Sequence, residues 1–227
     1  LGMGWSVVVD RRSLPELESR MRALYDDPQM RLWGDQARSG GRAAHAILYL
    51  EPQTPLNRRA IGFDMHSEPV RRAAMVKAAR TGQPAASGLI RLVQDGGSAQ
   101  KRDLGGAPGF LIYIPVYARG TDYGMFRAAP GSLRGFVYSP FRVGDFLAEP
   151  LRQIDEQGME ITIHEGGGMA RTLIYASNPD APPQTGGIAT DITIADRTWR
   201  MVVSGSDSSL LSSLALFTLA VGLLITL

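Results

Sequence analysis

Three histidines are the side chains in this 227-residue sequence best suited to metal binding or proton transfer: His45, His66 and His164. None belongs to an H-x-x-x-H or H-E-x-x-H pair, the spacing that places two ligands on one helix face. The chain has no cysteine, which excludes disulfides, thiolate chemistry and cysteine-ligated zinc. We therefore expect each histidine to be a surface or hydrogen-bonded residue, and we predict no metal site and no cofactor.

Catalytic motifs are absent from the sequence as well. There is no G-x-S-x-G, no G-x-x-x-x-G-K-[ST], no G-x-G-x-x-G after a strand and no EF-hand loop. Carboxylates are plentiful, but their spacing places no pair for acid–base work. Gly166–Gly168 could form an anion-binding nest, although glycines between two strands are more typical of a hairpin turn. We predict no catalytic residues.

Charge is nearly balanced, with 24 Lys and Arg against 22 Asp and Glu, for a net charge of +2. The basic residues are spread along the chain rather than gathered in one stretch. A nucleic-acid partner is therefore not expected.

The last eighteen residues, Leu210–Leu227, carry no charge. At about 1.5 Å per residue, a helix of this length spans roughly 27 Å, close to the hydrocarbon thickness of a bilayer. We predict a transmembrane helix at 208–227, with a buried core helix as the alternative. The sequence opens without a signal-peptide pattern and ends inside the apolar run, which suggests a fragment of a longer protein.

The preceding residues alternate between strand-forming and helix-forming patterns. One helix is expected from Ser13, as N-cap, to Tyr25, and another from Ser67, as N-cap, to Gly82, which is placed to end it. β-branched and aromatic runs predict strands at Trp5–Val9, Met30–Trp33, Ala43–Leu50, Ser87–Gln94, Gly109–Tyr117 and Gly135–Phe141.

A second, smaller module is expected over residues 143–207. Apolar residues at helical spacing predict a helix over Val143–Gln157. Strands are predicted at Met159–His164, Arg171–Ala176 and Ile188–Val203, the last split into a hairpin near Asp196. The fold class predicted is α+β, with modules at 1–142 and 143–207.

Several short motifs in the first module are more specific than its composition. They are Gly4–Trp5, Asn57–Asp64 (NRRAIGFD), Met65–Ala73, Ala79–Gly82, Ser87–Leu92, Gly109–Tyr117 and Gly135–Phe141. Their order and spacing resemble the CHASE domain over roughly residues 4–145. That domain is the extracytoplasmic sensor of bacterial transmembrane histidine kinases and nucleotide or diguanylate cyclases, and of plant cytokinin receptors.

The resemblance implies a fold and a setting. A CHASE sensor has a stalk helix and two PAS-like modules, lies between two membrane helices, and binds its ligand in the membrane-distal module. For this chain it implies a small-molecule ligand in residues 1–142, a membrane-proximal module at 143–207 and a homodimer. It also implies a sensor in the periplasm or outside the cell, attached to the cell inner membrane.

Arg71 is the first ligand-binding candidate that the resemblance supplies. In cytokinin-binding members an Asp near the start of this helix grips adenine, and by spacing that position is Arg71 here. A guanidinium can only donate hydrogen bonds, so the usual cytokinin geometry is not expected. Our hypothesis is that Arg71 selects an anionic or carbonyl-bearing ligand. The alternative places Arg71 on a solvated helix face beside Arg72.

Six further candidates follow from the same resemblance and from strand positions. Ser87 matches a family Thr at the start of the central strand, and Val93 matches a position whose backbone contacts ligand. Tyr113 sits in the middle of a predicted strand, where its hydroxyl could meet a ligand or face solvent. Asp64 is expected to hold a turn rather than touch ligand, while Tyr138 and Phe141 could line the pocket or pack in the core. The full set of ligand-binding candidates is Asp64, Arg71, Ser87, Val93, Tyr113, Tyr138 and Phe141.

The expected function is a ligand-sensing domain of a transmembrane receptor of the histidine kinase or cyclase type. The first alternative is a membrane-anchored extracytoplasmic enzyme. The second is a structural or assembly module, which a pocket with converging polar groups would argue against.

Overall fold

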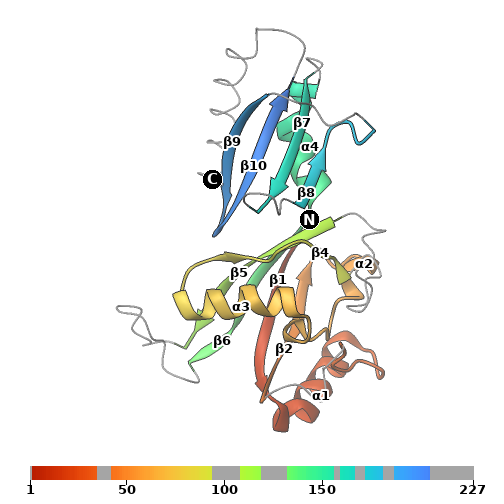
Figure 1. Cartoon of the computed structure of the whole chain (residues 1–227). Coiled ribbons are helices and arrows are strands. Elements are labelled where there is room, and N and C mark those ends of the chain that lie inside the picture. Colours follow the sequence, from red (N-terminus) through yellow and green to blue (C-terminus); the bar gives the residue numbers. More distant parts are fainter. Residues whose placement is uncertain are drawn as a thin grey trace. The chain divides into compact units, whose positions relative to one another are not determined.

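The computed structural model describes residues 2–34, 42–93, 108–118, 132–155, 159–166, 172–180 and 187–204. The chain divides into two compact units, Leu1–Arg142 and Val143–Leu227, each with its own antiparallel sheet (Figure 1). The predicted α+β class is confirmed.

No helix within the described ranges is long and apolar enough to span a membrane. The segment 208–227 lies outside the described residues, so the transmembrane helix expected there stays a prediction.

The first unit is built on a six-stranded sheet in the order β2-β1-β6-β5-β3, with β4 also pairing with β5. Every neighbouring pair in it is antiparallel. Its strands are β1 (Met3–Asp10), β2 (Ala43–Glu51), β3 (Ala85–Ala86), β4 (Ile90–Arg91), β5 (Pro108–Tyr117) and β6 (Leu133–Arg142).

Helix α3 (Pro69–Thr81) lies across one face of this sheet (Figure 1). Its first turn is capped by Glu68, whose carboxylate accepts hydrogen bonds from the backbone N–H groups of Val70 and Arg71. Gly82 ends the helix with a left-handed φ of 69°, which glycine adopts without the steric cost of a Cβ.

The remaining helices of the first unit are short or lie elsewhere on the sheet. Leu14 and Leu17 of helix α1 pack against a buried cluster of Leu32, Ala44 and Ala46, as do Val7 and Val9 of β1. The helices are α1 (Leu14–Tyr25), α2 (Pro55–Arg58) and two 3-10 turns, Arg11–Ser13 and Met65–Ser67.

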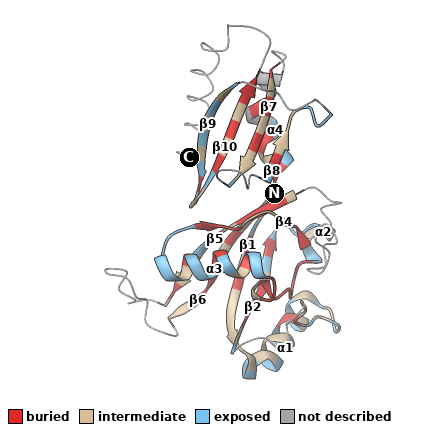
Figure 2. Cartoon of the chain, viewed as in Figure 1, coloured by how far each residue is buried: buried red, intermediate tan, exposed pale blue. Residues whose placement is uncertain are grey.

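The core of the first unit lies between α3 and the sheet, where strand alternation sorts the side chains. On β6, Phe136 and Tyr138 are buried, whereas Val137 and Ser139 between them are only half-buried. Figure 2 shows that α3 also has a buried and an exposed side: its outward side is exposed, and its sheet-facing side is buried. One face of β5 and β6 therefore builds the core under α3.

Two predicted strands are wrong. In Met30–Trp33 only Trp33 makes a bridge, to Phe63, because the neighbouring Leu32 N–H is taken by the Glu18 side chain. The strand predicted over Ser87–Gln94 is reduced to β4 (Ile90–Arg91) among its described residues, since β3 (Ala85–Ala86) ends before Ser87. The Ser87 hydroxyl interrupts it by accepting a hydrogen bond from Leu111 N and donating one to Gly88 O.

Both predicted serine caps are also corrected. Glu68 caps α3, while the Ser67 hydroxyl donates instead to Asp64 O at 2.6 Å. Ser13 occupies the N-cap position of α1 but makes no capping hydrogen bond with its side chain to a described residue. Asp10 caps the preceding 3-10 turn, so the chain already turns before α1 begins.

The second unit has a four-stranded sheet in the order β8-β7-β10-β9, which confirms the predicted hairpin between β9 and β10. β7 and β8 also pair antiparallel and Gly166 follows β7, while Gly167 and Gly168 of the predicted turn lie outside the described residues. The core of the second unit includes Ile161, Ile163 and Trp199. Its elements are α4 (Val143–Asp155), β7 (Glu160–Glu165), β8 (Thr172–Ala176), β9 (Ile188–Ile194) and β10 (Arg197–Ser204).

Candidate functional site

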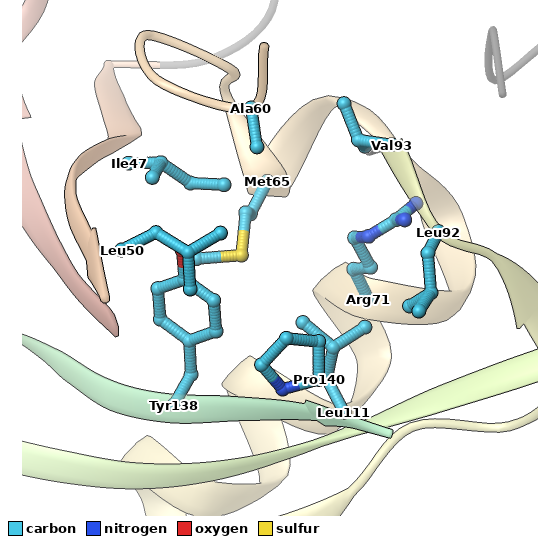
Figure 3. A pocket seen from close by; sticks show the side chains of 10 residues that line it. All are labelled: Ile47, Leu50, Ala60, Met65, Arg71, Leu92, Val93, Leu111, Tyr138 and Pro140. Carbon is cyan, nitrogen blue, oxygen red and sulfur yellow. The ribbon is translucent and has the colours of Figure 1, made fainter. Parts of the chain in front are cut away.

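A small cavity lies in the first unit, between the start of α3 and the sheet (Figure 3). It offers about 10 Å³ to the centre of a water molecule, which is room for roughly one water. Two of its lining residues are polar, Arg71 and Tyr138. The other eight are apolar: Ile47, Leu50, Ala60, Met65, Leu92, Val93, Leu111 and Pro140.

Arg71 faces this cavity rather than solvent, which contradicts the alternative of a solvated helix face. Its side chain is 4% exposed. Its Nη1 lies 3.4 Å from Glu68 Oε2, and its Nη2 donates to the backbone carbonyl of Arg91 at 2.9 Å. The guanidinium also lies 5.3 Å from the centre of the Phe63 ring. Arg71 therefore ties the first turn of α3 to β4.

Arg72, its neighbour along the helix, is half-buried and donates from Nη1 to the backbone carbonyl of His66. Successive side chains of a helix point about 100° apart, so the two adjacent arginines lie in different surroundings.

Tyr138 stands on the opposite side of the cavity from Arg71, beside Leu50 (Figure 3). The residue is 2% exposed, and its hydroxyl has no hydrogen-bond partner within the described part of the chain. Burial raises the pKa of this hydroxyl well above its ordinary value, so it is protonated and can donate. A buried hydroxyl without a partner costs about 1–3 kcal/mol, which a hydrogen-bond acceptor in the cavity would recover.

The ring of Tyr138 can lie where it does because β1 has a glycine opposite it. Gly4 pairs with Tyr138 in the sheet, and a Cβ at Gly4 would come within 2.4 Å of the Tyr138 ring. Gly4 therefore sets the depth at which Tyr138 sits below the cavity.

Gly4→Ala should lower the free energy of unfolding by about 1–3 kcal/mol, because the added methyl group forces Tyr138 out of its position. Urea unfolding of the full chain measures this effect. Gly144→Ala is the control, since a Cβ there meets no described atom within 4 Å. Equal stability of the Gly4→Ala and Gly144→Ala chains would contradict the close contact at Tyr138.

Of the other predicted candidates, Val93 lines the cavity, whereas Ser87, Tyr113, Asp64 and Phe141 are not among its lining residues. Ser87 is 1% exposed and holds β5 through Leu111 N. The Tyr113 hydroxyl lies 3.5 Å from Met65 Sδ behind the cavity wall, and burial raises its pKa. Phe141 stacks on Phe110 at 5.1 Å between ring centres.

Asp64 holds a turn, as expected. Its carboxylate is buried and accepts hydrogen bonds from the backbone N–H groups of His45 and His66 at 3.0 and 3.1 Å. Its other oxygen lies 3.3 Å from Arg11 Nη2. One side chain thus joins the 3-10 turn after β1, strand β2 and the turn that leads into α3.

His45 and His66 come together, which their separation in the sequence did not indicate. Their rings stack at 4.4 Å with an angle of 17° between the planes. His45 is 7% exposed, and its Nδ1 has no hydrogen-bond partner in the described ranges. It is therefore not the surface or hydrogen-bonded histidine that the sequence predicted. Burial, and secondarily His66, lower the pKa of His45 to about 3, so it is neutral.

Strand alternation could have found two of the lining residues that the sequence prediction missed. Pro140 follows Tyr138 by two residues on β6, and Leu111 precedes Tyr113 by two on β5, so each pair shares a sheet face. The contribution of Ala60 and Met65 has no such signal, since the loop before α3 brings them to the cavity.

Within the described residues, no group of three or more His, Asp or Glu side chains could hold a metal ion. The arrangement is thus a small apolar cavity with two hydrogen-bond donors on opposite sides. Ligand pockets are typically about 300–1,000 Å³, so a ligand larger than a water molecule would need this cavity to widen.

Comparison with known proteins agrees with the motifs in the sequence. Residues 1–175 match the CHASE domain family. No curated protein matches the chain at a significant level. The match covers the whole first unit, including the cavity, and α4, β7 and all but the last residue of β8 in the second. The chain therefore belongs to the CHASE domain family, whose members are extracytoplasmic sensor domains of signalling receptors.

Proposed function

We propose that the first unit senses a small molecule by binding it in the cavity between α3 and the sheet. The observation that carries this proposal is the buried Tyr138 hydroxyl, which lacks a partner in the described part of the chain and stands across an apolar cavity from Arg71. The ligand is an anionic or carbonyl-bearing compound, since both polar groups donate hydrogen bonds.

Ligand binding requires the cavity to widen, because its present volume suits only a water molecule. The wall formed by Leu92 and Val93 is suited to this movement, since β4 pairs with β5 through only two residues. A ligand that fits only the widened cavity shifts the population toward that conformation. Binding of the ligand and the conformational change of the first unit are then one event.

In the full receptor, this change passes through the second unit into the apolar segment Leu210–Leu227. We propose that this segment spans the inner membrane, with both units on the periplasmic or extracellular side as PAS-like modules. The output is then a histidine kinase or a diguanylate or adenylate cyclase, and the receptor is a homodimer. The chain's own role is recognition rather than catalysis, without a cofactor.

Thermal-shift screening of the full chain against a metabolite library tests ligand binding. A compound at 100 times its dissociation constant should add about 2.7 kcal/mol to the free energy of unfolding. Ala60→Leu fills the cavity and should abolish the shift, whereas Ala73→Leu on the exposed side of α3 should retain it. A library without binders, or a binder unaffected by Ala60→Leu, would contradict the proposal.

A further inference from the structure

We propose that this cavity selects an uncharged carbonyl compound, such as an ester or a primary amide, and excludes the corresponding carboxylate. This inference rests on the proposed binding of a small molecule in the cavity. It narrows the ligand to one of the two chemical classes that the donors alone would accept.

The first step of the argument is that the positive charge of Arg71 is already matched. The Glu68 carboxylate lies 3.4 Å from Arg71 Nη1, and the two side chains are 11% and 4% exposed. Glu68 cannot easily withdraw, because it also accepts hydrogen bonds from Val70 N and Arg71 N at 2.9 and 2.8 Å. A ligand carboxylate at Arg71 would be a second anion beside one cation, in surroundings that screen charge poorly.

The second step is that the guanidinium already binds an uncharged acceptor. Arg71 Nη2 donates to the backbone carbonyl of Arg91 at 2.9 Å, next along the chain to the lining residue Leu92. A ligand carbonyl offers the same acceptor with the same geometry, and it brings no charge that Glu68 would repel.

The third step concerns the far side of the cavity. Tyr138 supplies a hydroxyl that is protonated, buried and without a partner among the described residues, so it donates to an oxygen acceptor. Between the two donors the walls are aliphatic, formed among others by Leu50, Met65 and Leu111. A short branched alkyl group carrying one carbonyl matches both the polar and the apolar parts of this lining.

Three probes with the same branched body separate the classes: isovaleramide, methyl isovalerate and isovalerate. The full chain carries ¹³C-methyl methionine, and each probe is titrated at neutral pH. Met65 lines the cavity and reports binding there, while Met201 in the core of the second unit is the internal reference. The amide or the ester should bind at least about tenfold more tightly than the carboxylate.

Glu68→Gln tests the origin of this selectivity, since it removes the matching charge while keeping a carbonyl oxygen for the helix cap. The isovalerate affinity of this variant should rise about tenfold, with the amide affinity little changed. Glu16→Gln, which removes an exposed carboxylate paired with Arg20, is the matched control and should leave all three affinities unchanged. A dispersed Met65 resonance shows that each variant is folded.

Three results would overturn the inference. Isovalerate binding to the wild-type chain as tightly as the amide and the ester contradicts the selectivity, while leaving the cavity as a ligand site. If Glu68→Gln prefers the amide and the ester over isovalerate as strongly as the wild-type chain does, Glu68 is not the origin of the selectivity. The cavity would still stand as a ligand site. If none of the three probes perturbs Met65, the inference fails, and ligand binding in the cavity loses its support as well.

Discussion

Replacing Asp64 by alanine should lower the free energy of unfolding of the first unit by about 3–5 kcal/mol. The carboxylate is buried, accepts two backbone hydrogen bonds and faces Arg11 at 3.3 Å. Alanine would leave the buried His45 N–H without an acceptor and the largely buried Arg11 without this carboxylate. Because native domains are stable by only about 5–15 kcal/mol, this single change would remove a large part of the stability.

Urea unfolding, followed by the methyl resonances of Met21 and Met75 in the core of the first unit, measures this loss. Asp64→Asn should be milder, since it keeps one acceptor oxygen and the side-chain shape. Asp10→Ala is the control for losing an arginine-paired carboxylate in the same unit, because the Asp10–Arg12 pair is much more exposed than the Asp64–Arg11 pair. If Asp64→Ala lowers the free energy of unfolding no more than Asp10→Ala does, then Asp64 does not join the three elements as described.

Acidification should destabilise the first unit through His45. The pKa of His45 is lowered from 6.5 to about 3 by burial, with a smaller contribution from His66. The unfolded chain therefore binds a proton that the folded chain does not between these two pH values. The contribution of neutral His45 to the free energy of unfolding is fully present above pH 6.5 and is lost as the pH drops toward 3. At about 1.4 kcal/mol per pH unit, His45 alone removes roughly 4 kcal/mol over this range.

The groups around His45 explain why protonation is unfavourable in the folded state. His66 stacks on it and has a lowered pKa of its own, mainly from burial and further from Arg72 and Arg11, opposed by Asp64. On its other side lies Phe136, at 5.8 Å between ring centres, which cannot solvate a charge. A proton on His45 would thus meet an apolar ring and a cluster with two arginines.

The same methionine resonances, recorded in urea at several pH values, measure the slope of stability with pH. His45→Phe keeps a flat ring beside His66 and should flatten the slope between pH 6.5 and 3. His164→Gln in the second unit is the control and should leave the slope of the first unit unchanged. A slope that survives in His45→Phe would assign the acid sensitivity to other groups.

Local patterns in the sequence were sufficient to predict most helices and strands and to identify the family. β-branched runs predicted β1, β2, β5 and β6, and Gly82 predicted the end of α3, because these signals act within a few residues. The ordered motifs between Gly4 and Phe141 identified the CHASE domain for the same reason. In Met30–Trp33, which failed, the Leu32 N–H donates to the Glu18 side chain. In Ser87–Gln94, which also failed, the Ser87 hydroxyl accepts from Leu111 N, and both bonds join residues distant in the sequence.

The candidate site depended much more on tertiary packing. The sequence indicated Arg71, Val93 and Tyr138 by resemblance and strand position. The i,i+3 spacing of Glu68 and Arg71 permits an ion pair, but nothing local showed that both side chains are buried. The stacking of His45 on His66 likewise depends on how the turn after Asp64 meets β2.

The sequence by itself thus determined the α+β class, the CHASE family and an uncharged C-terminal segment of membrane-spanning length. Only the tertiary structure decided which side chains share the cavity, that the Arg71–Glu68 pair is buried, and which polar groups are buried without partners among the described residues. The physical reason is that propensity and periodicity act along the chain. Burial, pKa shifts and ion pairs, in contrast, depend on contacts between residues distant in the sequence, such as Arg11 with Asp64.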